Sequence, residues 1–189
     1  YLHKLESDGL VRKKELGWAH LYFNTSMAHL PRTIVITFMQ ALLSGYKKEL
    51  SDKTEKLKAI GRRILDHFQF PIGKSMVKEF ERMSKIREPQ EYLKLFEKIF
   101  NYFNLFEDDI DISIVELFKN KVIYRLRNSA FLDPSKDSYL FFYLACGITE
   151  AIYLKFVNKK IKSNVEKIHI SNNKEESFID ISLEIKEEE

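Results

Sequence analysis

The feature that most constrains the fold is a long apolar run followed directly by alternating, strand-like sequence. Residues 139–156 are almost wholly apolar on every face of a helix, and Ser138 before them is suited to cap its N-terminus. A helix that is apolar all round must be buried on all sides. Because Glu150 lies within the run and three lysines follow by residue 160, we expect a core helix and not a membrane span.

The spacing of apolar residues then changes from helical to alternating. Apolar side chains alternate with polar ones over residues 165–170 and dominate residues 178–185, with β-branched types enriched. Both features indicate β-strands. Residues 171–176 between them are Ser, Asn, Lys and Glu, which favour turns, so the sequence predicts a β-hairpin after the buried helix.

This helix and hairpin resemble the C-terminal half of the 4-vinyl reductase domain family, which is related in fold to TRAPP-type vesicle-tethering subunits. That family places a glycine in the buried helix, Glu-x-x-Cys on the next strand and Cys-x-hydrophobic on the last strand. Here Gly147 lies in the helix, and Glu166 and His169 occupy the ends of the Glu-x-x-Cys position. Ser177 stands in place of the second cysteine, with Ile179 at the hydrophobic position.

The resemblance covers about residues 60–185 and implies an α+β fold, a mixed α/β domain with antiparallel hairpins packed on helices. Family members sense aromatic compounds, lipids or tetrapyrrole precursors, so it also implies a small hydrophobic ligand. The family often binds zinc through its two cysteines. Ser177 is a poor zinc ligand, and regular alternation puts Glu166 and His169 on opposite strand faces. We therefore expect no metal at these positions and no other cofactor.

The first 24 residues show a second pattern. Leu2 and Leu5 share one helical face, and Gly9 is suited to end a helix in the left-handed conformation. Two short strand-like stretches follow, joined by a turn at Leu16-Gly17. This segment resembles the end of a winged helix-turn-helix domain of the ArsR or PadR kind, comprising the last part of the recognition helix and the wing. The resemblance is carried by Leu2-x-x-Leu5-Glu6-x-x-Gly9-Leu10-Val11, a polar hairpin and Leu21-Tyr22-Phe23.

Five basic residues in this segment are the predicted DNA contacts: His3 and Lys4 on the helix remnant, and Arg12, Lys13 and Lys14 on the wing. A helix in the major groove reads base edges while a basic hairpin beside it reaches phosphates. The alternative is a surface hairpin with ordinary solvated charges, and the net charge of +3 is too mild to indicate nucleic acid by itself. The first two helices of such a domain would precede Tyr1, so we expect this chain alone to bind DNA weakly.

Residues 25–56 form the predicted linker between the two parts. A helix over residues 32–50 carries more apolar side chains than one amphipathic face requires. Next to a DNA-binding module, the simplest cover for a broad apolar surface is a second copy of the chain, so we predict a homodimer. Packing of the helix onto its own chain is the alternative. The apolar residues concerned are Ile34, Val35, Ile36, Phe38, Met39, Leu42 and Leu43.

Helical spacing continues over residues 57–68, 76–86 and 89–106, and a strand hairpin is predicted over residues 110–127. The helix over residues 89–106 has an aromatic face that can line an apolar ligand site together with the buried helix. Core packing is the alternative for each of these side chains. The predicted ligand-binding residues are Phe96, Phe100, Phe103, Tyr124, Phe142, Tyr143 and Cys146.

No catalytic constellation emerges from the chain. The motifs of phosphate-binding loops, dinucleotide-binding folds, zinc proteases and serine hydrolases are absent. The single cysteine, Cys146, excludes an intrachain disulfide, fits a reducing cytoplasmic compartment and lies in an apolar helix where a thiol is normally inert. We therefore expect a protein that is not an enzyme.

These observations predict three parts: a winged-helix remnant over residues 1–24, a linker and dimerisation helix over residues 25–56, and a ligand-sensing domain over residues 57–186. Together they indicate a cytoplasmic, ligand-responsive transcriptional regulator that binds DNA. One alternative is a non-enzymatic scaffold, tethering subunit or small-molecule carrier of the same fold. Another is an enzyme of tetrapyrrole metabolism, which the family name suggests.

Overall fold

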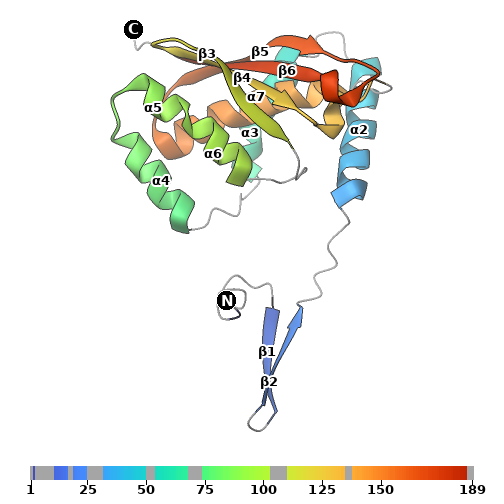
Figure 1. Cartoon of the computed structure of the whole chain (residues 1–189), viewed down its shortest axis with the longest axis vertical. Coiled ribbons are helices and arrows are strands. Elements are labelled where there is room, and N and C mark those ends of the chain that lie inside the picture. The colour runs from blue at the N-terminus through green and yellow to red at the C-terminus, as the bar shows by residue number, and fades with distance from the viewer. Residues whose placement is uncertain are drawn as a thin grey trace. The chain divides into compact units, whose positions relative to one another are not determined.

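The structure is a computed structural model that divides into two compact units, Tyr1–Ile34 and Val35–Glu189. In the first unit, β1 (Val11–Leu16) and β2 (Ala19–Asn24) pair as an antiparallel hairpin (Figure 1). The predicted hairpin is therefore confirmed, whereas the helix remnant expected before it lies outside the described residues. The residues that the structure describes are 2, 11–16, 19–24, 32–49, 54–67, 74–102, 110–134 and 138–186.

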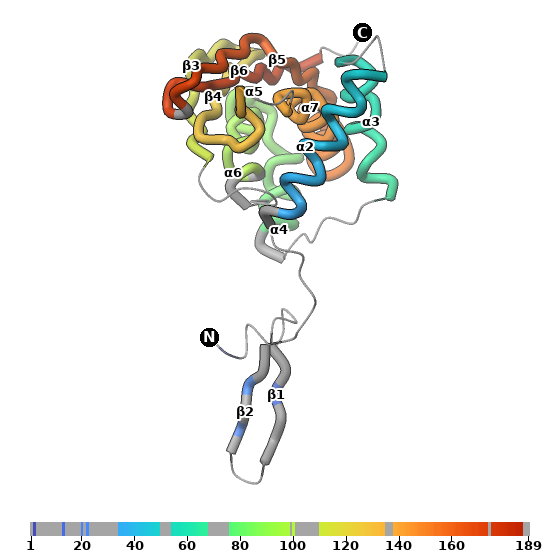
Figure 2. Tube along the Cα trace, turned by 90° about the vertical axis from the view of Figure 1, so that its right-hand side faces the viewer, coloured from blue at the N-terminus to red at the C-terminus, as the bar shows by residue number. Residues whose placement is uncertain are grey.

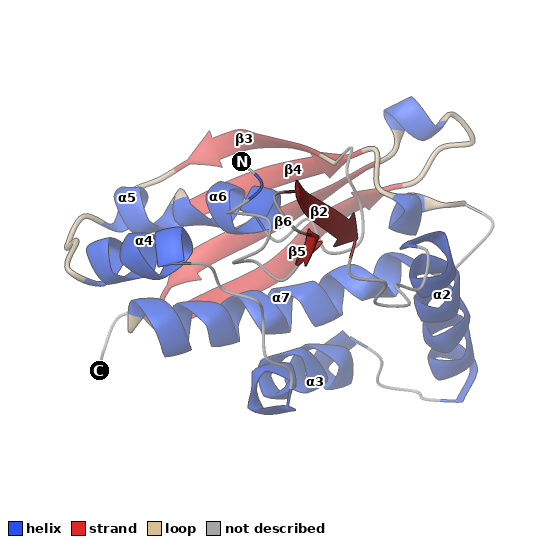
Figure 3. Ribbon diagram, turned by 90° about the horizontal axis from the view of Figure 1, so that it is seen from below, coloured by secondary structure: helices blue, strands red, loops and turns tan. Residues whose placement is uncertain are grey.

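The second unit is a four-stranded antiparallel sheet with its helices on one side, an α+β architecture as predicted (Figures 1 and 3). The strand order is β3-β4-β6-β5, so each hairpin contributes neighbouring strands and β4 pairs with β6 in the middle. The helices are α2 (Arg32–Glu49), α3 (Thr54–His67), α4 (Lys74–Ser84), α5 (Pro89–Leu93), α6 (Leu95–Tyr102) and α7 (Phe141–Ile152). Figure 2 shows these helices and the strands from the side. The strands are β3 (Asp111–Leu117), β4 (Lys121–Arg127), β5 (Ile161–His169) and β6 (Phe178–Ile185).

The two central strands explain why the sheet has one buried face. On β4 the buried residues alternate with half-buried ones, which is the pattern of a strand that packs on one side only. The buried residues of β4 pair directly with buried residues of β6 and form the sheet's half of the core. These pairs are Val122–Leu183, Tyr124–Ile181 and Leu126–Ile179.

The buried helix predicted after Ser138 is α7. It continues as a π-helical turn, Tyr153–Val157, and ends at Asn158 with a left-handed φ of 55°. Among the described residues, the run Ser138–Val157 is long and apolar enough to cross a membrane, yet more than half of it is buried within this unit. Its burial identifies it as the core helix of the unit.

The predicted N-terminal cap of this helix is wrong. Ser138 opens a short 3₁₀ turn, and its hydroxyl donates to the carbonyl of Phe131 at 3.0 Å. Leu140 holds the cap position of α7 without a capping side chain. Because Ser138 is fully buried, its hydroxyl satisfies a buried carbonyl in the preceding loop and not the helix end.

Two glycines bring α3 against α7. A Cβ atom added at Gly61 would meet the carbonyl of Leu144, and one added at Gly147 would meet the carbonyl of Lys58. Both obstacles are backbone atoms, which cannot move aside as a flexible side chain can. The glycines therefore allow the two helix backbones to approach more closely than any larger residue permits, and α3 is fixed along α7.

The single helix predicted over residues 89–106 is interrupted. The structure has α5 and α6, separated at Lys94, and residues 103–109 lie outside the described part. The carbonyl of Leu93 accepts hydrogen bonds from the hydroxyls of Tyr124 and Tyr153, both at 3.1 Å. These buried tyrosines satisfy a carbonyl at the end of α5, which stabilises the break that helical periodicity does not predict.

The predicted helix α2 is confirmed, and one of its faces packs onto the rest of the second unit. Leu43 and Gln40 are buried, and the amide of Gln40 donates to the carbonyl of Ala130 at 2.9 Å. The alternative of packing onto its own chain therefore holds for this face. The opposite face is left uncovered by the described residues, with Phe38 65% exposed and Leu42 55% exposed.

Candidate functional site

The predicted ligand-binding aromatics lie in the core in two groups. Phe96 contacts both Phe100 and Tyr124, with ring centroids 5.6 and 4.9 Å apart. Phe142 and Cys146 are buried on α7, and Tyr143 on the same helix is half-buried. Phe103 lies outside the described residues. Their role in binding a ligand therefore stays a prediction.

Cys146 is held in a state that disfavours reaction. Burial raises the pKa of its thiol to about 12, because the thiolate would lose its hydration. At neutral pH the nucleophilic thiolate is therefore scarce, and the thiol packs as a small apolar side chain.

The three positions that correspond to the family's zinc-binding motif do not converge. Ser177 is buried, accepts a hydrogen bond from the backbone of Ser171 and donates one to its carbonyl, so it stabilises the β5–β6 loop. Glu166 pairs with Lys121 at 2.8 Å, and His169 lies against the ring of Phe178. Among the described residues, no group of three or more His, Cys, Asp or Glu side chains is arranged to hold a metal ion.

One expectation about these residues is wrong. Regular alternation predicted Glu166 and His169 on opposite faces of the strand, but the pairing register shifts between Val165 and Lys167. The extra residue of this β-bulge shifts the inward–outward alternation of side chains by one position. Glu166 and His169 therefore both lie on the outer face of the sheet. A bulge of this kind has no signature in the sequence.

A cluster of polar side chains in the second unit surrounds Glu150 of α7. Its Oε1 accepts from Lys58 Nζ and from the backbone N–H of Ser163, both at 2.8 Å. Its Oε2 accepts from Arg62 Nε at 2.5 Å. Lys58 also donates to the side chain of Asn164 at 2.9 Å. The carboxylate thus joins α3, α7 and the edge of β5.

The environment of Glu150 favours its charged form. Burial alone would raise the pKa of the carboxyl, but the hydrogen bonds from Lys58, Arg62 and Ser163 together hold it below its ordinary value of 4.5. Lys58 is buried as well, and its amine donates to Glu150 and Asn164. The cluster therefore satisfies buried charges that would be costly alone.

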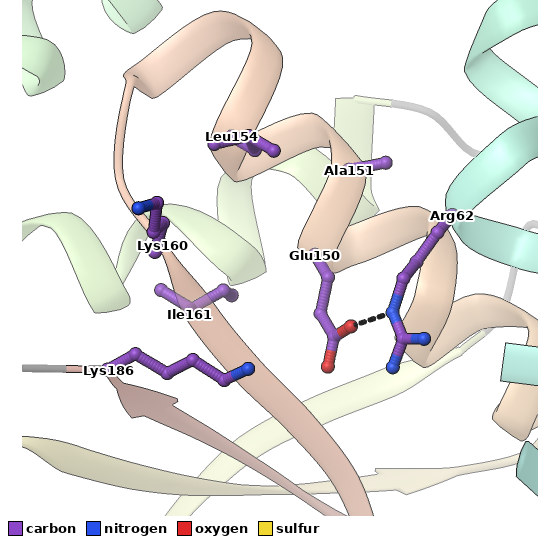
Figure 4. Close-up of a pocket in the computed structure, with 7 residues that line it drawn as sticks. All are labelled: Arg62, Glu150, Ala151, Leu154, Lys160, Ile161 and Lys186. Atoms are coloured by element: carbon purple, nitrogen blue, oxygen red, sulfur yellow. Dashed lines mark hydrogen bonds and ion pairs between the residues drawn. The ribbon is translucent and has the colours of Figure 1, made fainter. Parts of the chain in front are cut away.

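A pocket of about 250 Å³ opens beside this cluster (Figure 4). In the close-up, the Glu150 carboxylate lies between the side chains of Arg62 and Lys186. Three of the lining residues are apolar and belong to the end of α7, the π-helical turn and the start of β5. The complete lining is Arg62, Glu150, Ala151, Leu154, Lys160, Ile161 and Lys186.

The predicted DNA-binding residues fall only in part within the described chain. Arg12, Lys13 and Lys14 are consecutive on β1, opposite Phe23, Tyr22 and Leu21 of β2. His3 and Lys4 lie outside the described residues.

Sequence reasoning missed the Glu150 cluster, although two signals were present. A glutamate within a helix that is apolar on every face must find a cation when it is buried. Lys58 and Arg62 are four residues apart on the preceding helix, with Gly61 on nearly the same face. Together these signals predict that the charged face of α3 packs against the glutamate-bearing face of α7.

Comparison with known proteins gives a fold and no family. No protein-family model matches the chain, and no curated protein matches it. The structure is similar to trafficking protein particle complex subunit 3 from Naegleria fowleri, covalently bound to palmitic acid. The TM-score is 0.55 and the identity 16%, over 82% of this chain and 95% of that one. The chain has a TRAPP-like fold.

Two weaker similarities are to H-NOX proteins. The Fe(II) unliganded protein from K. algicida has a TM-score of 0.47 and 11% identity, over 88% of this chain and 79% of that one. A mutant H-NOX protein from T. Tengcongensis has a TM-score of 0.45 and 12% identity, over 98% of this chain and 86% of that one. These two similarities carry no conclusion about this chain.

Proposed function

We propose that the chain belongs to a cytoplasmic, ligand-responsive transcriptional regulator that binds DNA as a homodimer. In this proposal the first unit contributes a winged-helix wing, and the TRAPP-like second unit binds a small hydrophobic ligand without catalysing a reaction. A ligand can shift DNA affinity only if it binds two arrangements of the dimer with different affinity.

The observation that carries the proposal is the hairpin β1–β2 directly before α2. Its first strand bears three consecutive cations, Arg12, Lys13 and Lys14, in the position that a wing occupies after a recognition helix. Cations on a hairpin suit the phosphates that flank a major-groove helix. A structural hairpin needs no such run, which favours a binding role.

The uncovered face of α2 supports self-association. Ile34, Phe38 and Leu42 are spaced four residues apart and are each more than half exposed. Residues at this spacing form a continuous apolar stripe along one side of a helix. A second copy of α2 would cover the stripe, and two-fold symmetry would match a palindromic DNA site.

DNA binding is tested on the full-length protein. Replacing Arg12, Lys13 and Lys14 by Ala should lower the slope of log K against log salt by about one for each phosphate that the protein no longer neutralises. A control variant with Lys56, Lys78 and Lys162 changed to Ala removes the same amount of charge from the second unit. A slope that both variants leave unchanged contradicts the proposal.

Self-association is tested by light scattering with circular dichroism. Replacing Phe38 and Leu42 by Glu should give monomers that keep their helical signal, because both side chains point away from the core. Replacing buried Leu43 by Glu is the contrasting variant, and it should unfold the unit. A wild-type monomer at micromolar concentration contradicts the dimer.

A second candidate function is a non-enzymatic scaffold or tethering subunit. It is favoured by the TRAPP-like fold and by the free edge of β3, where Ile114, Val115, Leu117 and Phe118 are each about 40% exposed or more. An open sheet edge with apolar side chains is suited to strand addition by another protein. Weaker DNA binding by the wing variant favours the regulator over this candidate.

A further inference from the structure

Two lysines of the pocket are direct neighbours across the sheet. Ile161 of β5 pairs with Ile185 of β6, and the backbone N–H of Lys186 donates to the carbonyl of Lys160 at 3.1 Å just beyond that pair. Like charges at directly opposed positions of an antiparallel pair destabilise each other. Within the described part of the chain, neither lysine has an ion-pair or hydrogen-bond partner for its amine.

The one carboxylate of the pocket does not neutralise them. Both oxygens of Glu150 are engaged by Lys58, Arg62 and the N–H of Ser163. Within the described residues, three cations line the pocket: Arg62, Lys160 and Lys186. Lys58 also pairs with Glu150 although it does not line the pocket, so four cations surround one carboxylate. Arg62 bonds Glu150 through Nε, and its side chain is 44% exposed. The described lining of the pocket therefore carries an excess of positive charge.

The rest of the wall is apolar and incompletely covered. Leu154 is 53% exposed although it belongs to the apolar core helix, and Ala151 and Ile161 lie beside it in the pocket. Leu154 falls within the π-helical turn, a rare geometry that is frequent at functional sites. Cations beside an exposed apolar wall match a ligand that has a charged end and a hydrocarbon end.

We propose that this pocket binds an oxyanion carried on a hydrocarbon chain, such as an alkyl carboxylate or alkyl phosphate. The head group lies between Lys160 and Lys186, whose amines have no other partner within the described part of the chain. The hydrocarbon chain lies on Leu154. This proposal rests on the proposed function as a ligand sensor and names the ligand's chemical class.

The test is isothermal titration of the whole chain with four probes: octanoate, octyl phosphate, octanol and inorganic phosphate. One or both of the amphiphilic anions should bind, and the affinity should fall as salt is raised. Octanol and inorganic phosphate should bind at least about tenfold more weakly, because each lacks one of the two ends. Octanol binding as tightly as the anions overturns the proposal, and so does inorganic phosphate matching octyl phosphate.

The matched variants have equal net charge. Lys160→Gln with Lys186→Gln should weaken binding of the anion by about tenfold or more. Lys78→Gln with Lys162→Gln, two lysines outside the pocket, should leave the affinity unchanged. Equal weakening in both lysine pairs overturns the site.

The two proposals fail in different ways. If octanol binds as well as octanoate, the oxyanion site is wrong while a sensor of neutral apolar ligands stands. If octanoate binds through Lys160 and Lys186 but leaves the DNA affinity of the intact protein unchanged, the oxyanion site stands and the ligand-responsive regulator is wrong.

Discussion

The two edges of the four-stranded sheet differ in whether side chains from the helices cover them. At the β5 edge, Glu150 of α7 accepts from the N–H of Ser163, and Lys58 of α3 donates to Asn164. At the β3 edge, Val115 and Phe118 are 42% and 51% exposed, and the strand's burial pattern shows no buried residue. One edge is held by charged side chains from helices of the same unit, and the other is open and apolar.

This difference shows that the packing of two helices decides how one sheet edge is closed. Gly61 and Gly147 allow α3 to approach α7, and that approach carries Lys58 and Arg62 to the glutamate. The pocket lies at the closed edge, where charged side chains are already fixed in place. The open edge has no such fixed groups among its described residues, and an unpaired apolar strand favours protein contacts.

Breaking the helix contact should have the largest effect. Gly147→Ala places a methyl group against the Lys58 carbonyl, so α3 and α7 must separate. We expect the free energy of unfolding to fall by about 3 kcal/mol in chemical denaturation, at the upper end of the range for overpacking because the obstacle is backbone. Separation should also expose the buried Cys146, whose reaction with a thiol reagent reports the opening of α7.

Gly45→Ala is the matched control for that substitution. Gly45 lies in α2, and a Cβ added there meets nothing within 4 Å. The same change should therefore stabilise the chain by about 0.5–1 kcal/mol, because alanine favours the helix. Equal effects of the two substitutions would mean that the glycines do not set the distance between α3 and α7.

Removing the charge at the closed edge should have the next largest effect. Glu150→Gln keeps an acceptor for the N–H of Ser163 but leaves the buried amine of Lys58 without its anion. We expect the free energy of unfolding to fall by about 2 kcal/mol at pH 7. Glu79→Gln is the surface control, because Glu79 pairs with exposed Arg82 and Lys98, and it should cost less than about 1 kcal/mol.

The effect of Glu150→Gln should depend on pH in a defined direction. The pKa of Glu150 in the folded chain lies below its ordinary value of 4.5, so the carboxylate stabilises the fold fully above that pH. The stabilisation disappears as the pH falls through the folded-state pKa. The difference in stability between wild type and variant should therefore shrink below pH 4.5. A constant difference down to strongly acidic pH contradicts the ionic role of Glu150.

The comparison also shows what could be predicted from the sequence. The periodicity of apolar residues predicted α7, the β5–β6 hairpin and the β3–β4 hairpin, because in each of them the buried side chains follow a simple repeat along the sequence. It did not predict the break at Lys94, since that break depends on hydroxyls of Tyr124 and Tyr153 that come from distant parts of the chain. Tertiary hydrogen bonds of this kind leave no local signal.

The same distinction applies to the candidate site. The aromatic residues predicted to bind a ligand are conspicuous in the sequence, and the structure places the described ones in or against the core. The pocket instead combines Arg62 of α3 with Lys160 and Lys186, which are remote in sequence. Only the pairing of β5 with β6 brings the two lysines together, and strand register cannot be read from composition.

Changing the open edge should have the smallest effect on stability. Val115 occupies the register irregularity of β3 between Ile114 and Glu116, and its side chain is 42% exposed. Val115→Lys replaces an exposed apolar group by the charge that natural edge strands use against association. We expect the free energy of unfolding to change by less than about 0.5 kcal/mol. Ile123→Lys, on the neighbouring inner strand β4, is the control and should cost more, because that side chain is half-buried. If Val115→Lys destabilises the chain as much as Glu150→Gln does, the β3 edge is part of the folded core and the contrast between the two edges is wrong.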